Sequence, residues 1–244
     1  MHHVVLERWS QGNSGFHRLD ARAKLGAALV LLVLIATSRA RLPQLGAIYF
    51  VLLAGAFAWA RLPLRAALAR SAVVLPFSLI FGAISWLAGD SSRAAALVIK
   101  SYISALAVLL LMSTTPMPQL LRGLESMGVP RFLLMVAQFM YRYLFVISEE
   151  AQHMRAAAAA RGFTVRGASA GKVPFRPAAG VLAVLFARSY ARAQDIHRAM
   201  VARGFEGTFG LLQKSRFRWQ DGVFLAAAVV TPVAVRFALE RIAK

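Results

Sequence analysis

The sequence Ala-Arg-Gly-Phe occurs twice in this chain, at residues 160–163 and at residues 202–205. The copies are 42 residues apart, and at the same offset an upstream Ala-Gln pair also repeats, at residues 151–152 and 193–194. Each copy carries one arginine, whose planar guanidinium can donate paired hydrogen bonds to carboxylates and backbone carbonyls. A cation duplicated within the same local sequence predicts two equivalent contacts with two equivalent partner surfaces.

The repeated motif also has a purely local interpretation. A helix commonly ends at a glycine in the left-handed conformation, with an apolar residue beyond it and a cation that complements the helix dipole. One copy would indicate only a helix end, whereas two copies on the most basic face of the chain favour partner binding. The predicted binding residues are the three-residue cores of the two motifs: Ala160, Arg161, Gly162, Ala202, Arg203 and Gly204.

Two long helices are needed to position these motifs. The apolar pattern predicts one helix over residues 131–161 and another over residues 178–203, with a loop at 164–177 that contains glycine and proline. At 1.5 Å per residue the first helix would be roughly 45 Å long. It is apolar and aromatic at first and polar after Glu149 and Glu150, so we expect it to begin in or near a bilayer and to end in the cytoplasm. Small residues on the second helix predict a close crossing of the two: Ala183, Ala187 and Ala191.

The rest of the chain is predicted to lie in a membrane. Of the 244 residues 59% are hydrophobic, and the mean hydropathy is +0.59. Uncharged runs at residues 42–60, 71–89 and 101–121 are each long enough to cross a bilayer as a helix. Shorter runs at residues 25–38 and 222–235 are flanked by charges that can reach the interface. We therefore predict an all-α, polytopic integral membrane protein with about five transmembrane helices.

These spans divide the chain into four segments. Residues 1–24 form a cytoplasmic N-terminal segment, residues 25–113 a four-helix transmembrane region, residues 114–220 a cytoplasmic and interfacial region, and residues 221–244 the final transmembrane helix and C-terminus. The third segment begins with a short amphipathic helix that starts near Pro116 and ends at Gly128 and Pro130. The two long helices follow it.

The distribution of lysine and arginine predicts the orientation. With a cytoplasmic N-terminus, the cytoplasmic segments contain 22 of the 29 basic residues and the outer segments contain seven, so the C-terminus lies outside a cytoplasmic (inner) membrane. The basic start before an apolar run also resembles a signal peptide. However, Glu7 and Asp20 interrupt the leading segment, and a further apolar span follows within a few residues.

Several activities find no support in the sequence. The net charge of +19 could indicate nucleic-acid binding, but no nucleic-acid motif accompanies it, and cytoplasmic basic residues of a membrane protein meet anionic lipid headgroups. The chain has no cysteine, no Walker A pattern and no His-Glu-x-x-His. Adjacent His2 and His3 could chelate a cation only weakly, and no histidine falls within a predicted span. We predict no catalytic residue, no nucleic-acid partner and no metal site.

Four segments of the chain resemble a known family, the transmembrane T component of energy-coupling factor (ECF) transporters, and within it the CbiQ type linked to cobalt and nickel uptake. They are Phe-His-Arg-Leu-Asp-Ala-Arg-Ala-Lys-Leu at residues 16–25, Phe-Met-Tyr-Arg-Tyr-Leu-Phe at 139–145 leading into Glu-Glu-Ala at 149–151, and both Ala-Arg-Gly motifs. The resemblance covers nearly the whole chain. Position 21 is alanine where the family usually has proline.

The resemblance implies a non-catalytic energy-coupling subunit of an ABC importer. In that family the two arginine motifs, at the tips of crossed coupling helices, bind two cytoplasmic ATPase subunits of the CbiO type. The T component joins these subunits to a substrate-binding membrane S component of the CbiM type, and a small accessory subunit of the CbiN type can be present. ATP would then be bound by the ATPases and Co²⁺ or Ni²⁺ by the S component, so this chain would bind no cofactor itself.

Two alternatives stay open from the sequence. A T component that serves a vitamin S component would have the same architecture, and only the CbiQ-like sequence favours cobalt or nickel. A self-contained permease would need polar residues that converge near the bilayer midplane, and the predicted spans lack them.

Overall fold

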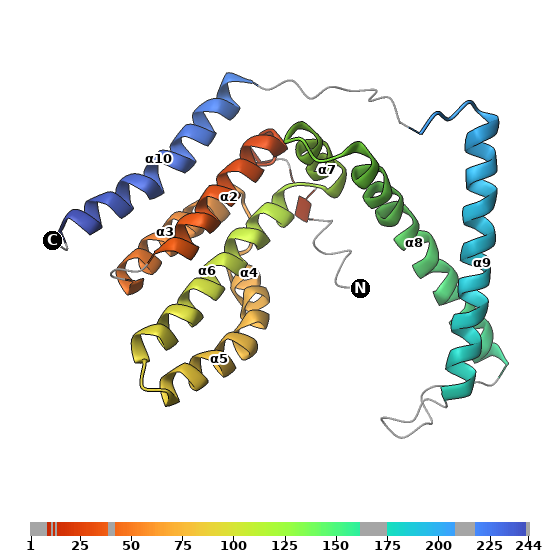
Figure 1. Cartoon of the computed structure of the whole chain (residues 1–244), viewed down its shortest axis with the longest axis horizontal. Coiled ribbons are helices and arrows are strands. Elements are labelled where there is room, and N and C mark those ends of the chain that lie inside the picture. The colour runs from red at the N-terminus through yellow and green to blue at the C-terminus, as the bar shows by residue number, and fades with distance from the viewer. Residues whose placement is uncertain are drawn as a thin grey trace. The chain divides into compact units, whose positions relative to one another are not determined.

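The computed structural model describes residues 9–10, 12, 14–38, 42–161, 175–207 and 218–242, and the regular elements in these ranges are helices (Figure 1). Contacts divide the chain into two units. The bundle unit contains residues 1–128 and 214–244, and the paired-helix unit contains residues 129–213. The chain therefore leaves the bundle unit once, after Gly128, and returns to it at Lys214.

The bundle unit is organised around one central helix, α6 (Ser91–Thr114), which packs against four other helices. These are α2 (Ala21–Thr37), α3 (Leu42–Trp59), α4 (Leu64–Ser71) and α5 (Leu75–Leu87); a short 3-10 turn, η1 (Ala72–Val74), joins α4 to α5. The same unit contains α7 (Met117–Ser126) and α10 (Trp219–Ile242). Tyr49 and Phe57 of α3 and Leu106 of α6 lie in its buried core.

Local sequence explains where α6 begins and ends. The carboxylate of Asp90 accepts a hydrogen bond of 2.9 Å from the backbone N–H of Arg93 and so caps the first turn. At the other end, Thr115 is extended and Pro116 has no N–H to continue the helix. The predicted span at residues 101–121 is therefore wrong at both boundaries. The helix begins earlier, at Ser91, and residues 117–121 belong to α7.

The other predicted spans coincide with helices whose bounds differ by a few residues. The predicted run 71–89 coincides with the second part of a continuous rod that begins earlier, at Leu64, and ends two residues before the run does, at Leu87. Within the described part of the chain, four helices are long and apolar enough to cross a membrane: Leu64–Leu87, Ser91–Thr114, Arg131–Ala160 and Trp219–Ala238; Pro43–Trp59 is a shorter apolar helix. Large apolar side chains such as Phe77, Ile80 and Trp86 are exposed on α5, as expected where a helix faces lipid.

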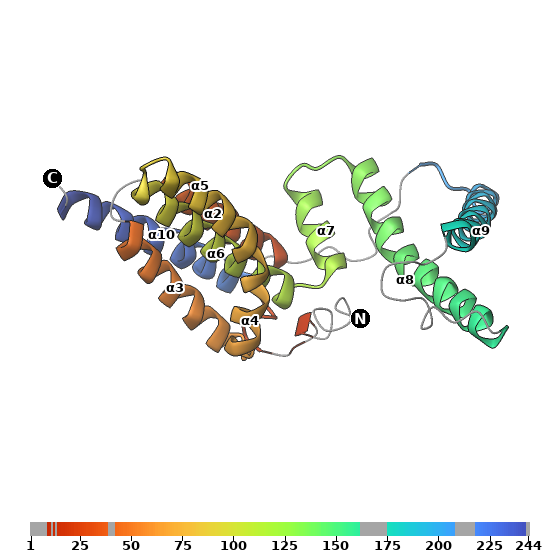
Figure 2. The same cartoon turned by 90° about the horizontal axis from the view of Figure 1, so that it is seen from below.

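Helices α2 and α10 lie side by side and run in the same direction (Figure 1, Figure 2). At their first turns the backbone N–H of Asp20 donates a hydrogen bond of 2.8 Å to Oδ1 of Asp221. Near their other ends Nη1 of Arg236 donates a hydrogen bond of 2.6 Å to Oγ1 of Thr37. The two helices are thus parallel and joined by polar contacts at both ends.

The segment before α2 is fixed by aromatic packing. The ring of Phe16 meets the rings of Trp59 on α3 and Phe224 on α10 edge to face, with centroids 5.5 and 5.4 Å away. The side chain of His17 closes a local turn, with Nδ1 2.6 Å from Oγ of Ser14 and Nε2 3.0 Å from the carbonyl of Trp9.

The paired-helix unit consists, in its described part, of α8 (Arg131–Ala160) and α9 (Phe175–Ala202). Helix α9 begins three residues before the predicted start at residue 178, and it includes Pro177 in its first turn, where proline is tolerated because no intrahelical N–H is needed. Residues 164–174 of the predicted loop lie outside the described residues.

Candidate coupling site

The first arginine motif lies at the C-terminal end of α8. Arg161 is the capping residue, and its backbone N–H lies 3.3 Å from the carbonyl oxygen of Ala157 and 3.2 Å from that of Ala158. Ala160 and Arg161 are both exposed. Gly162, the third predicted residue of this motif, lies outside the described residues.

The second motif forms the helix end that the sequence predicts. Gly204 has a φ of +77°, its N–H donates to the carbonyl of Val201 at 2.9 Å, and the N–H of Phe205 donates to the carbonyl of Met200 at 3.1 Å. This is the hydrogen-bond pattern of the Schellman motif, which requires a left-handed residue after the cap. The local interpretation is therefore confirmed for the second copy, and it leaves Ala202, Arg203 and Gly204 exposed.

The two arginines have similar surroundings. Arg161 and Arg203 are each exposed at a helix end, and neither guanidinium forms an ion pair within the described part of the chain. By contrast, Arg188 and Arg198 on α9 lie within ion-pair distance of Glu150 and Asp195. The tips therefore present two accessible cations with their donors available to an external carboxylate or carbonyl.

The helices that carry the tips cross at an ion pair. Nη1 of Arg188 on α9 donates to Oε1 of Glu150 on α8, and Figure 1 shows the two helices crossing with their C-terminal ends apart. From Glu150 to Ala160 is ten residues and from Arg188 to Ala202 is fourteen, so the two arms beyond the crossing are about 15 and 21 Å long.

The face predicted for this crossing is wrong. Ala183, Ala187 and Ala191 are exposed, and the partly buried positions of α9 include Leu185 and Ser189, which adjoin Arg188 on the helix surface. The sequence pattern could not identify this face because long apolar side chains lie on both sides of α9 and are exposed as well: Leu182 and Phe186 are 64% and 73% exposed.

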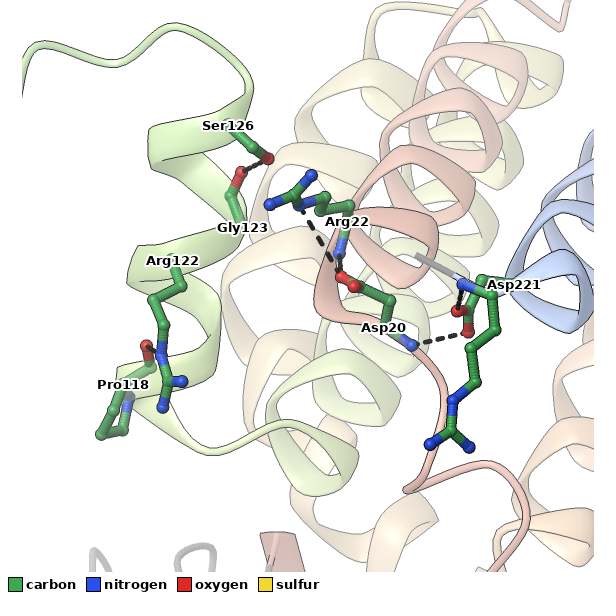
Figure 3. A network of polar contacts seen from close by, with 8 residues as sticks. Asp20, Arg22, Pro118, Arg122, Gly123, Ser126 and Asp221 are labelled. Atoms are coloured by element: carbon green, nitrogen blue, oxygen red, sulfur yellow. Dashed lines mark hydrogen bonds and ion pairs between the residues drawn. The ribbon is translucent and has the colours of Figure 1, made fainter. Parts of the chain in front are cut away.

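A polar network joins the start of α2 to the start of α10, the helix that follows the paired-helix unit in the sequence (Figure 3). It includes Asp20 before α2 and Asp221 in the first turn of α10. In the sequence Asp221 is only a charge beside an apolar run, and no sequence signal relates it to a residue 201 positions away. Among the described residues there is no group of three or more His, Asp or Glu side chains that could hold a metal ion.

Comparison with known proteins gives the class to which this arrangement belongs. Residues 12–214 match the CbiQ family, described as cobalt transport protein, and the chain belongs to this family. It is therefore an integral membrane protein and an ECF transmembrane component of the CbiQ type.

Individual relatives agree with the family assignment. The chain is 33% identical over 121 residues to the cobalt transport protein CbiQ of Rhodobacter capsulatus, a stretch that covers 50% of this chain and 48% of that protein. It is 26% identical to the energy-coupling factor transporter transmembrane protein EcfT of Bacillus selenitireducens, over 95% of this chain and 96% of the relative. A nickel permease, LarQ of Lactiplantibacillus plantarum, is 29% identical over 48% of this chain and 41% of its own length.

Proposed function

We propose that this chain is the T subunit of an ECF importer, in which Arg161 and Arg203 each bind one of two cytoplasmic ATPase subunits and the crossed helices α8 and α9 transmit ATP-driven movement to a membrane S component. The observation that carries this proposal is the pair of exposed arginine tips on two helices joined at Glu150 and Arg188. A rigid crossing converts a displacement at either tip into a displacement of the other helix.

The proposed cargo is Co²⁺ or Ni²⁺, bound by the S component. Two relatives that match about half of this chain support a transition metal, since one is named a cobalt transport protein and the other a nickel permease. The relative that matches 95% of the chain is named only as an energy-coupling component, without a cargo. Because that name specifies no cargo, a T component that serves a vitamin S component stays the second candidate.

The parallel arrangement of α2 and α10 supports the proposed topology. Three crossings by α3, the rod Leu64–Leu87 and α6 would return the chain to the side on which α2 begins. Helix α10 can then run parallel to α2 only if residues 115–218 make no net crossing. Helix α8 is long enough to span, but a single crossing by α8 would make α10 antiparallel to α2. We therefore place this region on the same side of the membrane as the start of α2, and the excess of lysine and arginine makes that side the cytoplasmic one.

The chain is proposed to contribute no catalysis. The sequence lacks the phosphate loop whose backbone amides and lysine hold a nucleotide, so the purified chain should hydrolyse no ATP above the detergent background. Clear hydrolysis by a preparation free of other subunits would contradict the assignment.

Affinity purification of the native complex tests the proposed function. We expect the tagged chain to retain two ATPase subunits and one membrane S component, with Co²⁺ or Ni²⁺ recovered only when the S component is present. Recovery of a vitamin in place of the metal would support the second candidate. Purification of the chain alone after mild solubilisation and cross-linking would contradict both.

A further inference from the structure

The carboxylate of Asp221 joins the start of α10 to the start of α2. Its Oδ1 accepts a hydrogen bond from the N–H of Asp20 and its Oδ2 accepts one from the N–H of Arg218, both at 2.8 Å (Figure 3). Asp221 is 4% exposed. A carboxylate that accepts two backbone hydrogen bonds while buried is held in one position, because both its charge and its lone pairs are satisfied there.

Asp20, the donor of this hydrogen bond, also caps a helix with its own side chain. Its own carboxylate accepts the N–H of Arg22 at 2.9 Å and caps α2, while its N–H points to α10. The capping residue of one helix therefore holds the first turn of another, 201 residues away in the sequence.

Lys24 brings the end of α6 to the same place. Its side chain is 3% exposed, and Nζ donates to the carbonyl of Thr114 at 3.0 Å and to that of His17 at 3.3 Å. Thr114 is the last residue of α6. The ammonium lies near the carboxylates of Asp20 and Asp221, whose negative charge offsets part of the cost of its burial.

Helix α7 packs on the same two turns of α2. A Cβ atom at Gly123 would lie 2.7 Å from Cδ1 of Leu25 and 3.4 Å from Cβ of Ala21. Only a glycine permits this approach without displacement of Leu25. Helices α7 and α10, which flank the paired-helix unit in the sequence, thus both contact the start of α2.

Few side chains of α10 beyond its first turn are buried. Among the side chains of α10 that the structure describes, Asp221 and Pro232 are buried and the others are partly or fully exposed. Beyond the first turn, residues of α2, α3, α6 and α10 line a pocket of about 270 Å³; Phe224, Ala227 and Ala228 are among them. At the N-terminal end of α10, which follows the paired-helix unit in the sequence, the hydrogen bond between Asp221 and Asp20 is thus the main contact that holds the helix in place.

We infer that Asp221 is a positioning residue for coupling: by fixing α10 to Asp20, it makes the first turns of α2 the anchor through which movement of α8 and α9 enters the bundle unit. The inference rests on the proposed function. Loss of the Asp221–Asp20 hydrogen bond should leave the ATPases bound and active. Helix α10 could then shift relative to α2 without moving it, so that ATP is hydrolysed with less metal uptake.

The test is the ratio of Co²⁺ or Ni²⁺ uptake to ATP hydrolysis by the complete complex in liposomes. Asp221→Ala removes both hydrogen bonds, so we expect it to lower this ratio at least about tenfold, the factor that corresponds to the loss of a single hydrogen bond to a charged group. Asp221→Asn keeps one oxygen acceptor and should lower the ratio only about threefold. Two matched controls should keep the wild-type ratio: Arg236→Ala removes the contact with Thr37 at the other end of the same helix pair, and Asp90→Ala removes a cap of the same type from α6.

The possible outcomes separate this inference from the proposed function. A wild-type ratio in both Asp221 variants, with the wild-type complex active, would overturn the inference and leave the coupling role of the chain intact. If Asp221→Ala yields no folded complex, the ratio measured for Asp221→Asn decides. Failure of the wild-type chain to retain ATPase subunits would instead contradict the proposed function.

Discussion

Arg188 of α9 and Glu150 of α8 form the ion pair that joins the two helices at their crossing. Their side chains are 62% and 26% exposed, so solvent weakens the attraction, and the pair is expected to contribute about 0.2 to 1 kcal/mol. Its importance is geometric, because it fixes the point about which the arms that end at Arg161 and Arg203 are held.

A double-mutant cycle tests this pair. Glu150→Arg and Arg188→Glu should each lower the melting temperature by placing like charges together, and the double exchange should restore part of the loss, with a coupling energy of about 0.5 to 1 kcal/mol. Glu149→Arg, at the neighbouring exposed position on α8, is the control and should show no coupling with Arg188→Glu. A cycle that is additive within error would show that the crossing does not depend on this pair.

Two mid-helix glycines should respond in opposite ways to substitution. Gly55 has no atom within 4 Å of a built Cβ, so Gly55→Ala should stabilise α3 by about 0.5 to 1 kcal/mol. Gly123→Val should separate α7 from α2 and destabilise by about 1 to 3 kcal/mol, because the added methyl groups meet Leu25. Thermal unfolding in one detergent measures both. Equal effects of the two substitutions would contradict the packing of α7 on α2.

The chain without cysteine allows a clean test of topology. Ser92→Cys, in the exposed first turn of α6, should be labelled in intact cells by a membrane-impermeant thiol reagent, because that turn is predicted to lie outside. Ser169→Cys, between the two long helices in sequence, should be labelled only after the cells are opened. The reverse pattern would invert the orientation, and labelling of both in intact cells would place the two sites on the same outer face.

The cap of α6 should make stability depend on pH in the acid range. Hydrogen bonds from the backbone N–H of Arg93 and the hydroxyl of Ser92 hold the pKa of Asp90 below its usual value. A depressed carboxyl pKa contributes stability above the unfolded value, near pH 4, and that stability is lost as the pH falls through the folded value. The difference in melting temperature between the wild type and Asp90→Asn should therefore be present at pH 7 and shrink below about pH 4. A difference that is constant over this range would show that the Asp90 charge does not contribute.

Much of the helical architecture could be predicted because uncharged runs bounded by charges are direct evidence of spans. The run at residues 42–60 became α3 with nearly the predicted bounds. The boundaries of α6 could not be predicted, because the helix includes Arg93 and Lys100. Nζ of Lys100 donates to the carbonyl of Ala36 at 2.9 Å, and a partner 64 residues away leaves no local pattern in the sequence.

Of the candidate site, only the features that depend on neighbouring residues could be predicted from the sequence. The end of α9 at Arg203 and Gly204 follows from neighbouring residues, and the structure confirms its geometry. The pairs Glu150 with Arg188 and Asp20 with Asp221 join residues 38 and 201 positions apart, and many other charges of the chain could have formed such pairs equally well. The binding role of the arginine tips stays a prediction.

Retention of ATPase subunits by arginine variants tests the central claim most directly. Loss of a cation from a capped helix end should cost only about 0.3 to 1 kcal/mol, whereas loss of a buried ion pair at an interface should cost roughly 2 to 5 kcal/mol. Arg155→Ala on α8 and Arg192→Ala on α9 remove the same charge from exposed positions away from the tips and serve as matched controls. Lysine at a tip should rescue only in part, because an ammonium lacks the planar fork.

The deciding comparison is between Arg161→Ala/Arg203→Ala and Arg155→Ala/Arg192→Ala, each as an affinity-tagged double variant assayed for bound ATPase and for metal uptake in cells. We expect the tip variant to insert normally but to lose nearly all ATPase and uptake, and to lose far more than either single tip variant, because the second attachment holds while the first is broken. The control variant should keep both activities. Full ATPase retention and uptake by the tip variant would show that these arginines only cap their helices and that the proposed coupling role is wrong.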